Sequence, residues 1–535
     1  MSLTFPTTIS GLGSVEHRLY RTLLRRLLNK RKRNALRRAY MDGRNELHDI
    51  GYALPPIAAD IDIVVGWPAK AVEALANRVV MDGLQSEDGM DLTEHIKTIV
   101  SSNDLLSMAD SVHTDAMVYS CSFVAVHRDI VGDPDTGNLT YTAVLQEYTA
   151  DVATGIWDKT KHRLDSALLF DVSDDYEQVI GIHLMMQHPR KAIINIVPDD
   201  EGWHVQDDYV NREDRIPCEL FAFRPDERRP FGRSRIDRTV MSLTDSAVRT
   251  FVRSEVQAEL YSVPPRYIIG ASEQMFTDGT GKLIPRWQLM LDQMLILPHD
   301  PESSENVQVG QFTQYSFEPH SAQLRQTATM FASATSLPPD AMGVLTDNPS
   351  SAEAIDKAQK ELCLLAEKCQ RWFGTPWQHI LARAQKETSG AMEIRVRPQW
   401  RNPATPSRAA AADAAVKLVQ ANILPADSEV TYDMLDLSGE QRKILRYERR
   451  EKEAQAALDA MSMQMQTPTA TNPDSNAGGG SELKASFDAL GVAIRAGVDP
   501  HSAAQLLGLN DVQFTGAVPV SLRMPQEDAD DLEDK

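Results

Sequence analysis

Cysteine is scarce in this sequence. Only 4 of its 535 residues are cysteines, and their spacing is irregular. So few cysteines cannot form a disulfide framework, which suits a protein made in a reducing cytoplasm. Cys363 and Cys369 stand six positions apart in a predicted helix, and that spacing does not suit two ligands of one metal ion. We therefore expect both to pack in a core.

Long apolar runs are also missing. No stretch of about 20 apolar residues occurs, so the sequence predicts no membrane-spanning helix. Residues 1–14 lack the basic and then apolar order of a signal peptide. Hydrophobic residues make up 42% and charged residues 24% of the chain, a balance typical of a soluble globular protein. A chain of 535 residues is too long for one core and predicts two to four domains.

The motifs of common enzymes are absent or incomplete. Gly279–Lys282 has the glycines and lysine of a phosphate loop, but Phe276 replaces its first glycine and Leu283 its hydroxyl residue. Gly232–Ile236 lacks the second glycine of a nucleophile elbow. Histidine or cysteine pairs at metal-binding spacing are missing. We therefore expect a protein that is not an enzyme and that needs no metal or cofactor.

Acidic residues outnumber basic residues in the whole chain, but basic residues are concentrated near its N-terminal end. The formal net charge is −21, whereas a protein that wraps DNA tightly is usually basic. Residues 15–46 predict a helix in which arginine and lysine interleave with leucine. Two interpretations stay open: a contact with nucleic acid or an acidic partner, or an amphipathic helix whose cations face water or nearby carboxylates. The contact residues on the first interpretation are Arg25, Arg26, Arg31, Arg33 and Arg37.

Residues 68–224 predict an α+β domain. Helical patterns over 68–80 and 92–118 come first, and Pro68 suits the first turn of a helix. The period then changes to that of strands, with Asp133–Gly137 as a hairpin turn. Short strands that follow one another predict a mostly antiparallel sheet. The expected strands are 122–126, 141–148, 167–172, 179–186, 192–197 and 220–223.

A helical hairpin with an insertion at its tip is predicted next. One helix opens at Pro230–Gly232 and runs to Ser262, and its partial apolar faces suit packing between identical subunits. Residues 266–313 look like a small α/β insertion with strands at 267–270 and 294–297. A second helix covers 318–336 and ends at Leu337–Pro339, because proline removes a backbone donor and restricts the residue before it.

The second half of the chain is predicted to be mostly helical. Ser350–Glu353 reads as a capping box that starts a helix to residue 388. Gly374 and Pro376 interrupt its pattern, and we expect a kink there rather than an end. Further elements are a strand at 392–397, helices at 407–421, 428–435 and 438–463, a flexible linker at 466–482, a helical unit at 483–509 and a disordered acidic tail at 526–535.

This order of elements resembles the portal proteins of tailed double-stranded DNA bacteriophages, of the siphovirus type found in actinobacteriophages. The resemblance spans roughly residues 15–465, and its strings are far more specific in this order than alone. They are Gly66–Pro68 with Ala71–Arg78, Phe231–Ile236, Ser350–Ile355 and Ala412–Lys417. The resemblance implies a multidomain α+β portal fold that forms a ring of twelve subunits around a DNA channel at one capsid vertex.

The resemblance also implies how the chain divides. The expected parts are an α/β wing (1–230), stem helix 1 (231–263), a small α/β clip (264–313), stem helix 2 (314–336), a tunnel loop (337–350), a long kinked helix with a returning wing strand (351–399), a helical crown (400–465), a linker (466–482) and a C-terminal unit with its tail (483–535). We expect assembly in the bacterial cytoplasm and residence in the virion. The implied partners are double-stranded DNA, the major capsid protein, scaffold, the terminase large subunit and a head–tail adaptor, with no membrane.

The tunnel loop and the stem are the expected sites. No lysine or arginine stands between Asp340 and Pro349, so the loop can touch DNA without the ion pairs that would slow its passage. A plain connector between two helices is the alternative. The expected DNA-channel residues are Asp340, Met342, Gly343, Val344, Leu345 and Asp347. The stem residues that line the channel or pair between subunits are Arg235, Arg238, Asp245, Arg249, Arg253 and Glu255.

A second function remains open on the sequence alone. A non-enzymatic nucleic-acid-binding adaptor or minor capsid protein would use the basic helix 15–46 as its contact face. Salt-sensitive DNA binding that depends on those arginines would distinguish it from a ring-shaped conduit.

Overall fold

The chain divides into two compact units, residues 1–405 and 406–535. The computed structural model describes residues 3–47, 63–87, 92–131, 140–261, 266–269, 308–311, 316–343, 352–392, 394–404, 408–435, 437, 439–465, 489–490 and 500–509. Within these ranges, no helix combines the length and the apolar character that crossing a membrane requires. The four cysteines are all buried, which confirms the core positions expected for Cys363 and Cys369.

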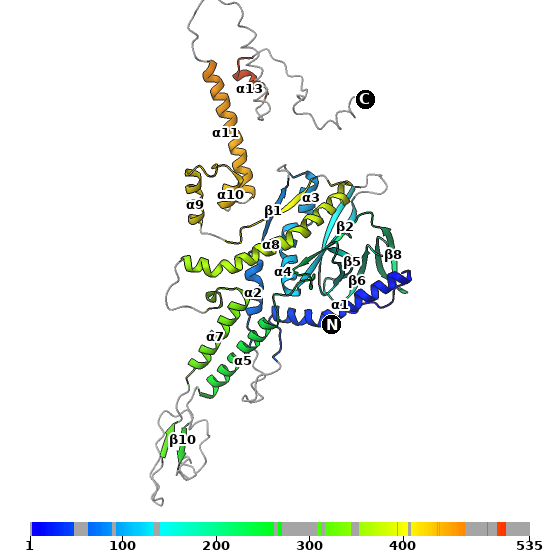
Figure 1. Cartoon of the computed structure of the whole chain (residues 1–535), viewed down its shortest axis with the longest axis vertical. Helices are drawn as coiled ribbons and strands as arrows, with labels where there is room; N and C mark the ends of the chain where they lie inside the picture. Colours follow the sequence, from blue (N-terminus) through cyan, green and yellow to red (C-terminus); the bar gives the residue numbers. More distant parts are fainter. Residues whose placement is uncertain are drawn as a thin grey trace, which may run out of the picture. The chain divides into compact units, whose positions relative to one another are not determined.

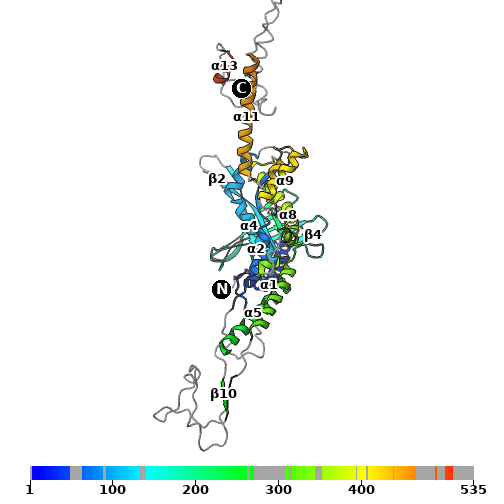
Figure 2. The ribbon, with the colours of Figure 1, turned by 90° about the vertical axis from the view of Figure 1, so that its left-hand side faces the viewer.

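Four helices open the first unit: α1 (Ser14–Met41), α2 (Trp67–Ala76), α3 (Glu94–Ser102) and α4 (Leu105–Tyr119). Helices α1, α2 and α4 contact one another, and Figure 2 shows α2 and α4 beside α1. Helix α1 is amphipathic, because Tyr20, Leu23, Leu24 and Leu27 fall on one buried stripe. It confirms the predicted basic helix, although it ends at Met41 instead of residue 46.

Two antiparallel sheets form the middle of this unit (Figure 1). The first has the order β3-β2-β9, with β2 (Cys121–Val131), β3 (Thr140–Thr149) and β9 (Cys218–Ala222). The second has the order β4-β5-β6-β7-β8, with β4 (Ala153–Asp158), β5 (Arg163–Val172), β6 (Val179–Met186), β7 (Ala192–Asp199) and β8 (Gly202–Val210). The predicted antiparallel α+β fold is confirmed, whereas β4 and β8 were not predicted. The predicted turn at 133–137 lies outside the described residues, but β2 and β3 pair as it requires.

A separate two-stranded sheet joins distant parts of the sequence. Strand β1 (Met81–Ser86) pairs antiparallel with β12 (Val396–Trp400). The strand predicted at 392–397 therefore lies further along the chain. The prediction stopped at Pro398, but in a two-stranded sheet each strand is an edge, and an edge strand tolerates proline.

Helices α5 (Arg238–Tyr261) and α7 (Glu318–Thr335) run side by side (Figure 1). The predicted start of the first helix at Pro230–Gly232 is wrong. Gly232 has a φ of +67°, and a Cβ there would lie 2.2 Å from the carbonyl oxygen of Phe223. The helix begins after Asp237, whose carboxylate accepts the backbone N–H groups of Thr239 and Val240 at 2.9 and 3.0 Å.

The insertion between α5 and α7 is described in part. Strand β10 (Arg266–Ile269) pairs antiparallel with β11 (Gln308–Gln311). Strand β10 confirms most of the strand expected at 267–270, and β11 was not predicted. The strand expected at 294–297 lies outside the described residues.

Helix α8 (Ala352–Ser389) is the longest element of the described chain, with 38 residues or roughly 57 Å of length. It continues through Pro376, as expected, and its start at Ser350 lies outside the described residues. One face is buried against the sheet β3-β2-β9 through Phe373, Trp377 and Leu381. The helix thereby covers the core of the first unit.

The second unit is helical where it is described. It contains α9 (Arg408–Gln420), α10 (Glu429–Met434), α11 (Gly439–Met465) and α13 (Pro500–Leu506). The first three confirm the predicted helices to within a few residues. Leu490, Ala503 and Leu507 belong to a small apolar cluster. The predicted linker at 466–482 and the acidic tail lie outside the described residues.

Candidate functional site

The base of the α5–α7 pair is built on an apolar contact. Ala247, Val248 and Val252 of α5 form a buried cluster against which Leu324 of α7 packs. Trp67, at the start of α2, packs against the same cluster and lies 5.3 Å from Phe331 of α7, measured between ring centroids. Apolar contacts between these three helices therefore fix the positions of α5 and α7 relative to α2.

Arg235 reinforces this base from within. Its side chain is only 4% exposed, and its guanidinium donates to the carbonyl oxygens of Ala71 in α2 and Thr335 in α7. Burial lowers the pKa of Arg235 to about 10, so the side chain stays charged at neutral pH. Arg235 was expected to line a channel or to pair between subunits; in the single chain its donors serve carbonyl groups of α2 and α7.

A second polar contact joins α1 to α5. The hydroxyl group of Tyr40 donates to Asp245 Oδ1 at 2.7 Å. Burial and this hydrogen bond raise the pKa of the Tyr40 hydroxyl. Asp245 was expected to line the channel or to pair between subunits; within the chain its carboxylate accepts the hydrogen bond of Tyr40. The other expected stem residues are placed differently: Arg238 and Glu255 are exposed, and Arg249 and Arg253 are half-buried.

The solvent-exposed face of α7 in the single chain carries few charged side chains. Arg325 is the only charged residue between Pro319 and Pro339. Thr329 and Ser333 are exposed on this face, and Met330 is 55% exposed. Such a face has small polar groups and one thioether but a single cation. This weakly charged face was not predicted from the sequence. The signal for it was the interval from Pro319 to Pro339, which contains no lysine, aspartate or glutamate.

The loop after α7 begins in a defined conformation. Ser336 ends α7 with a φ of +56°, and the N–H of Leu337 bonds to the carbonyl of Ala332 at 2.9 Å. A single 3₁₀ turn, Pro339–Met342, follows and closes at Gly343 with a φ of +75°. A residue in the left-handed conformation after each helical segment turns the chain sharply. Glycine suits this conformation at position 343 because it has no Cβ.

The expected DNA-channel residues divide into two groups. Asp340 is exposed at the start of the 3₁₀ turn, and Met342 packs partly against the main core. Gly343 is exposed, and a Cβ there would contact nothing within 4 Å. Val344, Leu345 and Asp347 lie outside the described residues, so the middle of the loop stays a prediction.

Three of the five arginines predicted as contacts on the basic helix serve the fold. Arg26 lies over the ring of Phe231, 4.5 Å from its centroid, and Arg37 donates to the carbonyl oxygen of Tyr119 at 2.7 Å. Arg31 donates to the carbonyl oxygen of Leu3 at 3.0 Å. Arg25 and Arg33 remain exposed. The helix is thus partly a structural element and only partly a free cationic face.

The centre of α8 is locked to α4. The indole N–H of Trp377 donates to Nε2 of His113 at 2.9 Å, and His113 stacks on Phe373 with centroids 4.7 Å apart. Burial lowers the pKa of His113 to about 3, so the ring is neutral and can accept this hydrogen bond. Gly374 and Pro376 lie between Phe373 and Trp377 in the sequence, and a Cβ on Gly374 would make only an ordinary contact of 3.7 Å with Trp400.

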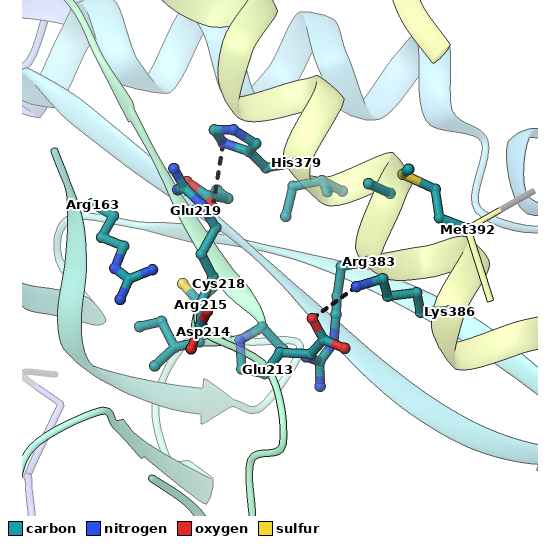
Figure 3. A pocket seen from close by; sticks show the side chains of 14 residues that line it. Arg163, Glu213, Asp214, Arg215, Cys218, Glu219, His379, Arg383, Lys386 and Met392 are labelled. Carbon is teal, nitrogen blue, oxygen red and sulfur yellow. Dashed lines mark hydrogen bonds and ion pairs between the residues drawn. The ribbon is translucent and has the colours of Figure 1, made fainter. Parts of the chain in front are cut away.

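A pocket of about 260 Å³ lies between α8 and residues 213–219, which lead into β9 (Figure 3). Charged side chains pair across this pocket: Lys386 Nζ of α8 lies 2.7 Å from Glu213, before β9, and His379 Nδ1 of α8 lies 3.5 Å from Glu219 of β9. Burial raises the pKa of the Cys218 thiol well above its usual range, so the thiol stays protonated. The pocket therefore resembles an ion-paired seam between helix and sheet. No group of side chains in the described ranges could hold a metal ion.

Most of the chain matches one known protein family. Residues 19–455 match the family of phage portal proteins described as SPP1 Gp6-like. The chain belongs to this family. The portal protein of Mycobacterium phage L5 is 26% identical over 390 residues, which cover 71% of this chain and 77% of that protein. The portal protein of Mycobacterium phage D29 is 24% identical over 404 residues, with the same two coverages.

Solved structures also show similarity, at a lower level. A chain from the virion of the native gene transfer agent particle is 14% identical, has a TM-score of 0.36, and is matched over 66% of this chain and 85% of its own length. A chain from the neck of that particle, computed with C12 symmetry, has the same identity and TM-score, with coverages of 69% and 89%.

Proposed function

We propose that twelve copies of this phage portal protein form a ring at one capsid vertex, and that double-stranded DNA enters and leaves the head through it. Membership of the portal family over residues 19–455 carries the proposal. Twelve is the ring size that the family resemblance implies. In this assignment α5 and α7 are the stem, the insertion between them is the clip, and the segment after α7 is the tunnel loop.

The charge distribution supports α7 as a wall of the channel. A wall that neutralised many phosphates would hold DNA, since each neutralised phosphate adds affinity. The exposed face of α7 offers one cation, Arg325, over about five helical turns. The chain as a whole carries a net charge of −21. Both features favour a surface along which DNA slides.

The base of the stem supports a rigid tube around moving DNA. Arg235 and the Val248 cluster hold α5 and α7 together, and the Trp377–His113 contact fixes α8 to α4. Of the described residues of the loop between α7 and α8, 339–343, Met342 packs partly against the main core, while Asp340 and Gly343 are exposed. The proposed moving part is therefore this loop, which narrows around DNA.

The partners follow from the same assignment. The clip would meet the terminase large subunit during packaging and the head–tail adaptor afterwards. The wing would meet the major capsid protein and scaffold. The proposed location is the capsid vertex of the virion, after assembly in the host cytoplasm.

Light scattering of the purified protein, followed by electron microscopy, tests the ring. We expect a particle of about 714 kDa (12 × 59.5 kDa) with a central hole and no need for nucleotide. A stable 59.5 kDa species that binds duplex DNA tightly would replace the conduit by a nucleic-acid adaptor that uses α1.

A further inference from the structure

A large basic groove lies between α1, residues 224–237 and the first turns of α5. Its volume is about 1260 Å³, and Figure 1 shows α1 and α5 meeting there. Ten arginine and lysine side chains line it, against two carboxylates. This local balance of +8 stands in a chain of net charge −21, so the rest of the chain carries −29 (−21 − 8). The groove therefore carries a net charge opposite in sign to that of the rest of the chain.

The two carboxylates of the groove are already occupied. Asp237 caps the start of α5, and Asp245 accepts the hydrogen bond of Tyr40. Neither carboxylate forms an ion pair with a groove cation in the described part of the chain. The positive charge is therefore left largely uncompensated by the groove itself.

Several of the cations repel one another. Lys30, Arg33, Arg228 and Arg229 are exposed, and their side chains have no hydrogen bond or ion pair among the described residues. Burial lowers the pKa of Lys30, and so do the charges of Arg33, Arg26, Arg37 and Arg229. A bound anion would relieve this repulsion, since an opposite charge favours the charged form of each group.

The walls of the groove are held in place without a ligand. Arg26 stacks on Phe231, and Arg37 is fixed on the carbonyl of Tyr119. The N–H of Arg233 bonds to the carbonyl of Phe223 at 2.8 Å, and Gly232 adopts the left-handed conformation that this close approach requires. A preformed groove loses less conformational freedom when it binds, which strengthens association.

We propose that this groove binds an acidic protein segment, an extended stretch rich in aspartate and glutamate, carried by a partner protein other than this chain. Arginine suits such a ligand because its planar donors match a carboxylate in two parallel hydrogen bonds. A short segment meets only the +8 of the groove, whereas a long nucleic acid would also meet the −29 of the remaining chain. The charge distribution thus favours a local acidic peptide over DNA.

The test compares two triple variants with the same loss of charge. The groove variant is Arg33→Gln, Arg228→Gln and Arg229→Gln. The control is Arg18→Gln, Arg21→Gln and Arg25→Gln, which removes three exposed arginines from α1 that do not line the groove. All six side chains are exposed and make no contact that the fold needs, and thermal unfolding checks that both variants fold. The probe is a fluorescent peptide of ten glutamates, measured with the full-length protein.

We expect the groove variant to bind the glutamate peptide at least tenfold more weakly than the parent, and the control to stay within twofold. The mass of the assembled protein should be the same in all three. Equal weakening in both variants would show general charge attraction and overturn the proposal. Tighter, groove-dependent binding of duplex DNA would assign the groove to nucleic acid instead. A lower mass of the groove variant would assign it to a second copy of this chain.

Discussion

The guanidinium of Arg235 donates a hydrogen bond to the carbonyl oxygen of Thr335 across 2.8 Å, and this joins the segment before α5 to the last turn of α7. A cation at the C-terminus of a helix is favourable, because the unpaired carbonyls there carry partial negative charge. The same side chain bonds to Ala71 in α2. One buried arginine thus ties three elements together.

Replacing this arginine should destabilise the protein. Arg235→Met leaves two buried carbonyl groups without their charged donor, and we expect a loss of about 3 kcal/mol in the free energy of unfolding. Arg233→Met is the matched control, because Arg233 is exposed and pairs with Asp226 at the surface. We expect its effect to stay below about 1 kcal/mol. Urea unfolding measures both, and similar losses would contradict a special role of Arg235.

Acid should weaken the contact between α4 and α8. His113 is buried with its pKa lowered to about 3, while an unfolded histidine has a pKa near 6.5. Between these values the unfolded chain binds a proton that the folded chain does not. Stability is therefore lost as the pH falls from about 6.5 towards 3, by at most about 1.4 kcal/mol per pH unit from this group. Unfolding at several pH values should show a shallower slope in His113→Gln than in the parent, and equal slopes would refute this.

Removing one hydrogen bond tests the same contact at neutral pH. Trp377→Phe keeps an aromatic ring in the core but deletes the N–H that His113 accepts. We expect a loss of about 1–2 kcal/mol, since a buried acceptor is left without its donor. Trp372→Phe is a control on the same helix, because Trp372 is only partly buried at the edge of the core. Thermal unfolding measures both variants. A loss in Trp377→Phe no larger than in Trp372→Phe would contradict a stabilising role of this hydrogen bond.

Positive charge on the outward face of α7 should slow DNA. Thr329→Arg with Ser333→Arg adds two cations, one helical turn apart, to positions that are exposed in the single chain. If α7 lines the channel, packaging should fall at least tenfold while the ring keeps its mass. Thr329→Gln with Ser333→Gln adds similar bulk without charge and should package DNA normally. Normal packaging by the arginine variant would remove α7 from the channel wall.

Shortening the loop tests its proposed role. Deletion of residues 340–347 should leave the ring intact, since the described contacts at the base of α5 and α7 do not involve this segment apart from Met342. If this loop is the narrowest part of the channel, packaging should fail. Electron microscopy and a packaging assay measure the two effects separately. Full packaging with the deletion would make the loop a simple connector.

The sequence predicted the elements better than their ends and contacts. The pattern of α8 was strong enough to carry the helix correctly through Pro376. The start of α5 was misplaced because Pro230 suits a first helical turn, while the true cap, Asp237, stood seven residues later. Charge alone could not separate Arg31 and Arg37, whose donors are held by distant carbonyls, from the exposed Arg33. Contacts between residues far apart in the chain leave no local pattern to read.

The pairing of β1 with β12 has a consequence for synthesis. Ser86 pairs with Val396, and Arg78 donates to the carbonyl oxygen of Pro403. At about 5–20 residues per second, a ribosome needs roughly 15–60 s to make the 310 residues that separate these strands. During that interval the nascent chain contains β1 without its partner, while α5 and α7 are being made. Completion of this small sheet therefore joins the segment after α2 to the segment after α8 only late in synthesis.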